Sequence, residues 1–229
     1  MAGQASVIAI DGPVAAGKTV VGRELARRLG FKFLDTGVMY RAITWLALRC
    51  SIPMDDEAAL GALAHNTPIL MRGQDGDQVL IGEHEVGLEL RDPLVDSHVS
   101  LVARLPEVRR ALVRQQRAIA QQGKIVMVGR DIGTVVLPDA SLKVFMLASV
   151  IERARRRWQE LLQQGRGAEF SQVLQETEAR DYIDSHRSDS PLAPAEDVFL
   201  IDTEGLSADQ VVNQILQRVC QASGPSREG

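Results

Sequence analysis

The sequence predicts an α/β fold in which parallel strands are covered by helices on both faces. Short apolar segments alternate with stretches of helical periodicity along the chain. Five of these segments are expected to form buried strands: Val7–Ile10, Phe31–Leu34, Ile125–Val128, Val144–Leu147 and Val198–Ile201. Apolar strands separated by helices are typical of a parallel sheet, because parallel neighbours need crossover connections. A length of 229 residues suits one such domain with a small accessory lobe.

Several of the expected helices carry clear end signals. Val21, Leu25 and Leu29 lie four residues apart on one helical face, and Gly30 is placed to end that helix. Pro106 suits the first position of another helix. Two further helices are expected to begin with a capping box, formed by Ser149 with Glu152 and by Ser207 with Gln210.

Composition and charge narrow the class of protein. The formal net charge is −4, which argues against a general nucleic-acid binder, because such proteins usually carry a basic face. No apolar run approaches the ~18 residues needed to span a bilayer, and the N-terminus lacks the pattern of a signal peptide. Cys50 and Cys220 are far apart and are expected to be buried or inert thiols in a reducing cytoplasm. Monomer is the default expectation for oligomeric state.

A glycine-rich motif follows the first expected strand and opens the first expected helix. Gly12 to Thr19 reads GPVAAGKT and matches GxxxxGK[ST], the phosphate-binding loop, or P-loop. Backbone N–H groups of such a loop point at phosphates, and the helix N-terminus adds its positive dipole. Lys18 is expected to reach the β- and γ-phosphates of ATP, and the Thr19 hydroxyl is expected to ligate Mg²⁺. The expected ATP-binding residues are Gly12, Pro13, Val14, Ala15, Ala16, Gly17, Lys18, Thr19 and Val20.

Other uses of this loop fit the sequence less well. A glycine-rich turn without a ligand remains the plainest alternative. A dinucleotide-binding loop is disfavoured because GPVAAG lacks the GxGxxG pattern. A GTPase is disfavoured because neither Asn66 nor Asn213 lies in an NKxD-type segment. Asp202, at the end of the fifth expected strand, suits a strand-end cap better than a Mg²⁺ partner.

Two charged segments follow strands that end at the same edge of the sheet as the P-loop. This edge is where open α/β sheets bind ligands. Arg41 lies in the segment after the second strand and could neutralise an acceptor phosphate, while Asp35 could orient water on Mg²⁺. The alternative for Asp35 is a helix N-cap, with Arg41 a surface residue. Arg130 and Asp131 directly follow the third strand and are expected to face the acceptor.

The helix expected after Ser149 is strongly cationic. It carries Arg153, Arg155, Arg156 and Arg157 before the glycines at 165 and 167. A helical lid closing over ATP would supply positive charge to a phosphoryl-transfer transition state and exclude water. The alternative is a solvated basic face. The residues expected to act in catalysis are Lys18, Arg130, Arg153 and Arg157.

The expected domain organisation is one P-loop kinase domain over residues 1–220 with two insertions. Its core covers about 1–65, 106–148 and 188–220. A nucleoside-monophosphate (NMP) binding lobe is expected at about 66–105, because the sequence between Pro68 and Arg104 reads as two short strands joined by a Gly/Asp turn. The lid is expected at about 149–187, and residues 221–229 are expected to form a disordered tail.

An ordered set of motifs over nearly the whole chain resembles the bacterial cytidylate kinases. These motifs are GPVAAGKT, LDTGVMYR, PEVRRAL, GRDIGTVVLPDA and the stretch from ARD to HRSDSPLAPA. The resemblance implies transfer of the γ-phosphoryl of ATP, with Mg²⁺, to CMP or dCMP. It also implies that the substrate-binding residues are Thr36, Tyr40, Arg41, Ser100, Arg109, Gly129, Arg130, Asp131, Arg180, Asp184 and Arg187.

Within that set, the resemblance implies distinct tasks. Arg41 and Arg130 would clamp the acceptor phosphate. Cytosine recognition would fall to Thr36, Arg109, Asp131 and Arg187, and ribose contacts to Ser100, Arg180 and Asp184. A carboxylate such as Asp131 can accept from the cytosine amino group, whereas a uracil carbonyl would face it unfavourably.

The chain departs from the family pattern at two positions. Val128 stands where many members have an acidic residue before the GRD sequence, which suggests weaker monophosphate binding. Thr36 stands where serine is also common, and its hydroxyl is retained. The alternatives to a CMP kinase are a P-loop kinase for UMP, AMP or a small metabolite, and a nucleotide-binding protein without catalysis.

Overall fold

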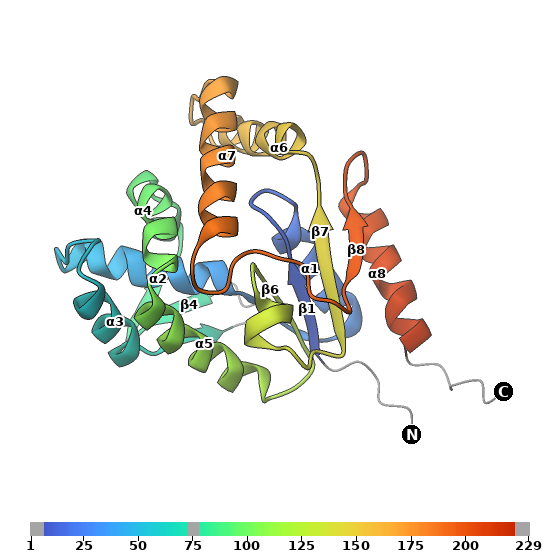
Figure 1. Cartoon of the computed structure of the whole chain (residues 1–229), viewed down its shortest axis with the longest axis horizontal. Coiled ribbons are helices and arrows are strands. Elements are labelled where there is room, and N and C mark those ends of the chain that lie inside the picture. Colours follow the sequence, from blue (N-terminus) through green and yellow to red (C-terminus); the bar gives the residue numbers. More distant parts are fainter. Residues whose placement is uncertain (1–6, 73–77, 223–229) are drawn as a thin grey trace.

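The computed structural model describes residues 7–72 and 78–222, and it contains a parallel sheet of five strands in the order β2-β6-β1-β7-β8 (Figure 1). The strands are β1 (Val7–Asp11), β2 (Lys32–Asp35), β6 (Ile125–Gly129), β7 (Leu142–Leu147) and β8 (Phe199–Asp202). Each corresponds to one of the five predicted apolar segments, with bounds shifted by one or two residues. Every neighbouring pair is parallel. The predicted α/β fold is therefore confirmed.

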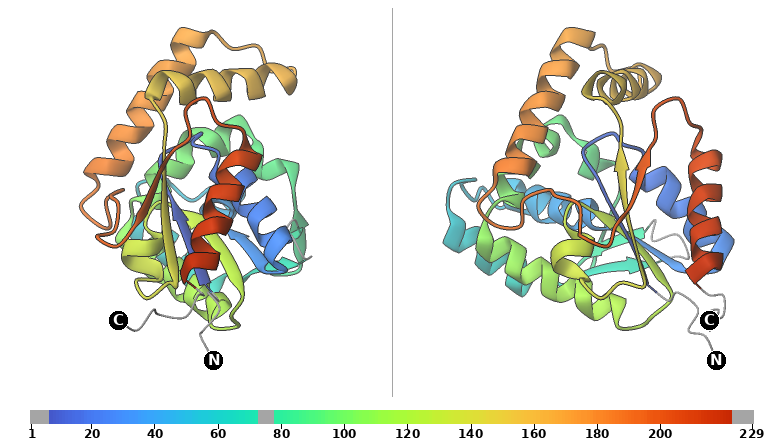
Figure 2. Two further views of the ribbon diagram at one scale, coloured as in Figure 1. Left: turned by 90° about the vertical axis from the view of Figure 1, so that its right-hand side faces the viewer. Right: turned by 45° about the vertical axis from the view of Figure 1, so that its right-hand side comes forward.

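Alternate residues of the strands pack on opposite faces of the sheet, and both faces are buried at the central strands β1 and β6, whereas Leu200 of the edge strand β8 is exposed. Ile8 and Ile10 of β1 pack against α1 and α8, whereas Ala9 packs against the group that contains α2 and α5. Figure 2 shows α1 and α8 together on one side of the sheet. The helices of the core are α1 (Lys18–Leu29), α2 (Thr36–Arg49), α5 (Pro106–Ala120) and α8 (Ala208–Ala222). A five-residue π-helical segment, η2 (Ile132–Val136), follows β6.

The predicted helix ends are confirmed. Gly30 ends α1 in the left-handed conformation at φ 65°, and Pro106 is in the first turn of α5. The Ser149 side chain accepts from the Glu152 backbone N–H at 3.3 Å, but the Ser149 N–H donates to Glu204, so the capping box predicted with Glu152 is only half formed. Ser207 and Gln210 form the reciprocal bonds of a capping box, at 3.3 and 2.8 Å.

A smaller lobe lies beside the sheet, at the left of Figure 1. It contains α3 (Glu57–Asn66), β3 (Ile69–Arg72), β4 (Gln78–Ile81), β5 (His84–Val86), a 3₁₀ turn η1 (Leu88–Arg91) and α4 (Pro93–Ala103). The three strands form an antiparallel sheet in the order β3-β4-β5. The sequence predicted only two strands here, because β5 has three residues and little apolar pattern. The predicted Gly/Asp turn lies outside the described residues.

Two long helices rise above the carboxyl ends of the strands. They are α6 (Val150–Gln163) and α7 (Phe170–His186), in yellow and orange in Figure 1. Ala154, Leu161 and Val173 form a small apolar core between them. Trp158 packs against this core and donates from Nε1 to the Ala168 carbonyl at 2.8 Å. The basic side chains of α6 therefore lie on the faces of the helix that do not pack against this core.

Three smaller expectations meet different outcomes. Gln221 and Ala222 are the last residues of α8, so the predicted tail begins too early, and 223–229 lie outside the described residues. Cys50 and Cys220 are both exposed and unpaired, so the prediction of burial is wrong. Within the described ranges, every helix is too short or too polar to cross a bilayer.

Candidate active site

The loop between β1 and α1 is shaped by glycines at both of its ends. Gly12 has φ 150°, and a Cβ placed on it would overlap the carbonyl oxygen of Met146 at the end of β7. Gly17 has φ 90° immediately before α1, and Ala15 has φ 57°. These left-handed residues bend the backbone around the space above β1. The predicted P-loop therefore has the backbone shape that the motif requires.

Lys18 is buried in the first turn of α1 and folded back on this loop. Its Nζ donates to the Pro13 carbonyl at 2.6 Å, and its side chain is 7% exposed. Burial, with a smaller contribution from the positive charge of Arg130, holds the pKa of Lys18 well below its usual range. Asp35 and Asp11 act in the opposite direction. An anion in the loop would satisfy an ammonium group that protein burial alone disfavours.

Thr19 and Asp35 meet at the mouth of the loop. The Thr19 hydroxyl donates to Oδ2 of Asp35 at 2.7 Å, and Oδ1 of Asp35 accepts from the Gly37 N–H at 2.9 Å. Asp35 is thus the N-cap of α2 and also a partner of Thr19. Mg²⁺ prefers oxygen ligands and takes few from the protein when phosphates and waters supply the rest. The pair fits such a site. No group of three metal-ligating side chains occurs in the described ranges.

Arg153 links helix α6 to the P-loop. Its Nη1 donates to the Val14 carbonyl at 3.2 Å and to Oδ1 of Asp181 at 3.0 Å. Its Nη2 donates to Oδ2 of Asp181 at 2.5 Å, and its side chain is buried. The two parallel bonds from Asp181 on α7 fix the guanidinium plane. The cationic helix is therefore not a solvated basic face at this position.

A buried charged cluster lies on the other side of the edge, between α5 and the end of β6. Nη2 of Arg109 is paired with Oδ2 of Asp131, and both side chains are almost fully buried. Nη2 of Arg187 lies 3.6 Å from Oδ1 of Asp131. The Tyr40 hydroxyl accepts from Nη1 of Arg109 at 3.3 Å, and burial raises the pKa of Tyr40 to about 12. Tyr40 is therefore neutral.

A second charged cluster connects this region with Lys18. Nε of Arg130 donates to Oδ2 of Asp184 at 2.8 Å. Burial and the positive charges of Arg130 and Arg41 lower the pKa of Arg180 to about 10, against the opposing effects of Asp184 and Asp96. The pKa of Asp184 lies below its usual value, because nearby arginines outweigh its burial. The charge of Arg130 thus acts on both Lys18 and Arg180, and the charge of Arg41 acts on Arg180.

Arg41 and Arg157 are both bound to one carboxylate, that of Asp96 on α4. Nη1 of Arg41 lies 2.7 Å from Oδ1 of Asp96 but forms an ion pair without a hydrogen bond, whereas Nη2 of Arg157 donates to Oδ2 at 3.2 Å. Arg41 also donates to the Leu90 carbonyl at 3.0 Å. Of the alternative interpretation, Asp35 is indeed the N-cap of α2, but Arg41 is a partnered and only partly exposed residue.

A comparison with protein families decides which kinase this arrangement belongs to. The sequence pattern of the family described as cytidylate kinase matches residues 8–221. The chain belongs to the cytidylate kinase family. The match includes both clusters and the P-loop.

Individual relatives agree with the cytidylate kinase assignment. The chain is 46% identical over 212 residues to a protein named cytidylate kinase from Caldanaerobacter subterraneus subsp. tengcongensis, covering 93% of each chain. It is 48% identical over 210 residues to a protein of the same name from Streptococcus pneumoniae strain 70585, covering 91% of this chain and 94% of that one. A solved structure of an uncharacterized protein from Eubacterium ventriosum has a similar fold, with a TM-score of 0.54 at 12% identity, over 95% of this chain and 99% of that one.

Four of the expected site residues are not members of the charged clusters described above. Thr36, Gly129 and Ser100 were expected from the family resemblance, and Val20 from the P-loop motif. The Thr36 hydroxyl is buried and donates to the Val128 carbonyl at 2.9 Å. Gly129 has no room for a Cβ, because Thr36 Oγ1 and Ile132 would overlap it. Ser100 lies on α4 one turn after Asp96, on the same helix face. The side chain of Val20 is 62% exposed.

Sequence reasoning missed four acidic residues that hold this site together. Asp96, Asp181 and Asp189 partner arginines of the site, and Asp11 accepts from the N–H groups of Ile132 and Gly133 at 2.8 and 2.7 Å. Asp11 directly precedes the P-loop at the end of an apolar strand, and that position was a usable signal. Asp181 and Asp189 lie within the ARD and HRSDSPLAPA motifs, which were also a usable signal, whereas Asp96 lies on α4, where an isolated aspartate carries no pattern.

Proposed function

We propose that this chain transfers the γ-phosphoryl group of ATP to CMP or dCMP, giving ADP and CDP or dCDP. The acceptor phosphate oxygen attacks the γ-phosphorus in line, and the bond to the β-phosphate oxygen breaks. Such a reaction needs positioning and positive charge more than a nucleophilic side chain. The proposal draws on both the membership of the cytidylate kinase family and the geometry of the charged clusters.

The observation that carries the substrate assignment is the Arg109–Asp131–Arg187 cluster. Nε of Arg109 and Nη2 of Arg187 are buried without a hydrogen-bond partner among the described residues, as is Nε of Arg180. Buried donors of this kind are costly unless a ligand satisfies them. Cytosine offers a carbonyl and a ring nitrogen as acceptors, and its amino group can donate to Asp131. Uracil would place a carbonyl against that carboxylate, which favours CMP over UMP.

The remaining predicted residues take roles that follow from their surroundings. Lys18, with Arg153 held against the P-loop, would stabilise the charge on the phosphates being transferred. Arg130 beside Asp184, and Arg41, would bind the acceptor phosphate, with Arg180 and Asp184 near the ribose and Ser100 above it. Thr36 would act through the Val128 carbonyl, which it holds, rather than as a free donor to cytosine.

Mg²⁺ is the proposed cofactor with ATP, and it would screen the charge of the phosphates. The Thr19 hydroxyl would bind it directly, and Asp35 would hold a water on it. We also propose that residues 66–105 act as the monophosphate lobe and 149–187 as the lid of one domain. The chain is proposed to work as a cytoplasmic monomer without nucleic-acid partners.

A coupled assay of ADP release across CMP, dCMP, UMP, AMP and shikimate tests the proposal. We expect turnover with CMP and dCMP and at least about a hundredfold lower kcat/KM with UMP. Preferred turnover of UMP, AMP or shikimate would assign a different kinase. Binding of ATP with no turnover of any acceptor would instead support a nucleotide-binding protein without catalysis.

A further inference from the structure

Three arginines from two separate parts of the molecule converge on the carboxylate of Asp96. Arg41, from α2, lies against Oδ1 at 2.7 Å. Arg157, from the lid helix α6, lies 3.2 Å from Oδ2, and Arg166, from the loop after α6, lies 3.6 Å from the same oxygen. The two oxygens of one side chain thus face the core on one side and the lid on the other. Asp96 therefore bridges α2 on one side and α6 with its following loop on the other.

We propose that Asp96 is a positioning residue that ties the lid to the monophosphate lobe and holds Arg41 and Arg157 where the phosphates bind. This inference rests on the proposed function, because it assigns Asp96 a task in that reaction. Asp96 itself need not touch either nucleotide.

The charges explain why one carboxylate has this effect. Guanidinium groups that share a region repel one another, and side-chain exposures of 18% for Asp96, 21% for Arg41 and 27% for Arg157 limit the screening of that repulsion by water. Arg41 is also bound to the Leu90 carbonyl and Arg157 to Glu160, but among these partners Asp96 is the one carboxylate within 4 Å of all three arginines. Removing its charge would allow Arg157 and Arg166 to move away with the lid.

Asp96 leaves the cluster attractive to phosphate. Glu160 also lies 2.8 Å from Arg157, so two carboxylates against three guanidiniums leave a net charge of +1, and the cluster still attracts a phosphate dianion. A carboxylate that merely competed with the substrate would be expected to neutralise the arginines, and this one does not. The arrangement therefore favours positioning of the arginines over competition for them.

A second lid-to-lobe contact is too exposed to replace Asp96. Arg91 lies 3.7 Å from Glu160, but the side chains are 65% and 44% exposed. Exposed pairs of this kind contribute little, because water and salt screen them. The half-buried cluster at Asp96 therefore carries most of the electrostatic attraction between the lid and the lobe.

The first test is kinetic and uses CMP and ATP with three variants. Asp96→Asn removes the charge at nearly constant shape, Asp96→Glu retains it, and Glu85→Gln removes a carboxylate from exposed strand β5 of the same lobe. We expect Asp96→Asn to lower kcat/KM for CMP by about tenfold, mainly through KM. We expect Asp96→Glu to recover most of that loss and Glu85→Gln to change kcat/KM by less than about twofold.

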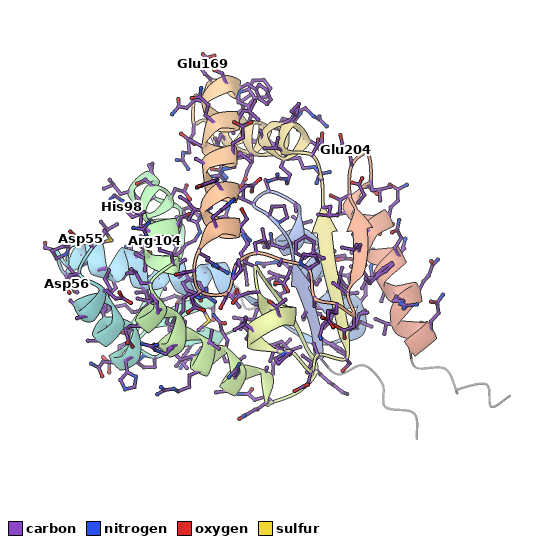
Figure 3. All side chains as sticks on the ribbon, in the orientation of Figure 1. Asp55, Asp56, His98, Arg104, Glu169 and Glu204 are labelled. Carbon is purple, nitrogen blue, oxygen red and sulfur yellow. The ribbon has the colours of Figure 1, made fainter. Side chains whose placement is uncertain are left out.

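A second measurement follows the lid without using activity. Figure 3 labels Asp55, on the outer side of the lobe, and Glu169, at the upper end of α7. Both side chains are exposed, so cysteines there can carry spin labels once Cys50→Ser and Cys220→Ser remove the exposed native thiols. We expect Asp96→Asn to broaden and lengthen the distance distribution between the labels. Arg166→Gln should produce part of that change, and adding it to Asp96→Asn should produce little more.

The outcomes separate failure of this inference from failure of the proposed function. If the unmodified chain does not phosphorylate CMP, the proposed function fails, and the label distances still test the tie between lid and lobe. An unchanged distance distribution in Asp96→Asn, with the variant folded by circular dichroism, would overturn the inference. A lower KM for CMP in Asp96→Asn would also overturn it, because Asp96 would then be a competitor for Arg41.

Discussion

Two adjacent residues of α5 allow the cost of the buried charged cluster to be measured directly. Arg109 is 2% exposed and paired with Asp131, which is itself buried. Its neighbour Arg110 has a side chain 63% exposed and is paired with Glu107 at the surface. Arg109→Gln and Arg110→Gln make the same chemical change one residue apart. Arg109→Gln leaves the buried carboxylate of Asp131 without its closest partner, whereas Arg110→Gln affects only the exposed carboxylate of Glu107.

The expected magnitudes follow from that difference. Breaking a buried ion pair by removing one partner costs about 3–5 kcal/mol, because the remaining charge stays buried. Arg187 lies 3.6 Å from Asp131 and offsets part of this cost, so we expect Arg109→Gln to lose about 3 kcal/mol. An exposed pair contributes about 0–1 kcal/mol, which sets the limit for Arg110→Gln.

Unfolding by urea and by heat measures both variants. For a domain of this length, about 3 kcal/mol corresponds to a fall in Tm of roughly 6–12 °C for Arg109→Gln. Arg110→Gln should shift Tm by no more than about 4 °C. A difference of less than about 1 kcal/mol between the two variants would contradict the reasoning, since Asp131 would then not depend on Arg109. The measurement needs no substrate, so it is independent of the proposed function.

Three further changes have expected outcomes. Lys18→Ala should lower kcat by at least about a thousandfold in the ADP-release assay, and normal turnover would refute its role. Gly12→Ala should destabilise the fold by about 2 kcal/mol or more in urea unfolding, because its Cβ meets the Met146 carbonyl. Burial raises the pKa of Asp11 from 3.8 to about 6, so folded Asp11 releases its proton less readily than unfolded Asp11. Its contribution to stability is therefore fully present below pH 4 and is lost as pH rises through 6. The free energies of unfolding of Asp11→Asn and of the parent chain can be compared by urea unfolding. Between pH 3.5 and 7.5 the parent should lose about 3 kcal/mol of stability relative to the variant. A stability difference that does not change with pH would contradict the raised pKa of Asp11.

The sequence was sufficient to predict the main sheet and the P-loop beside it. Each strand of the main sheet contains a short, largely apolar segment, and the P-loop motif sits between one such segment and a helix. Local patterns of this kind specify local structure. The third strand of the small sheet, His84–Val86, has only one buried residue and gave no such pattern.

The acceptor side was harder to predict because its contacts are distant in sequence. Arg130 meets Asp184, and Arg157 meets Asp96, across 54 and 61 residues. The family resemblance identified Asp184, since it lies within a motif. Asp96 lies in no motif, and an aspartate in a helix is most often solvated. Only the folded arrangement of α4 against the lid reveals its partners.

The order of strands in the main sheet has a consequence for synthesis of the chain. Val7 of β1 pairs with Ile125 of β6, and Ile8 pairs with Leu142 of β7. A ribosome that has released the first hundred residues has therefore made the central strand but neither of its neighbours. The apolar segment of β1 therefore lacks both of its partner strands until the residues of β6 and β7 have been synthesised. Nascent chains of this protein should depend on chaperones most strongly in that interval.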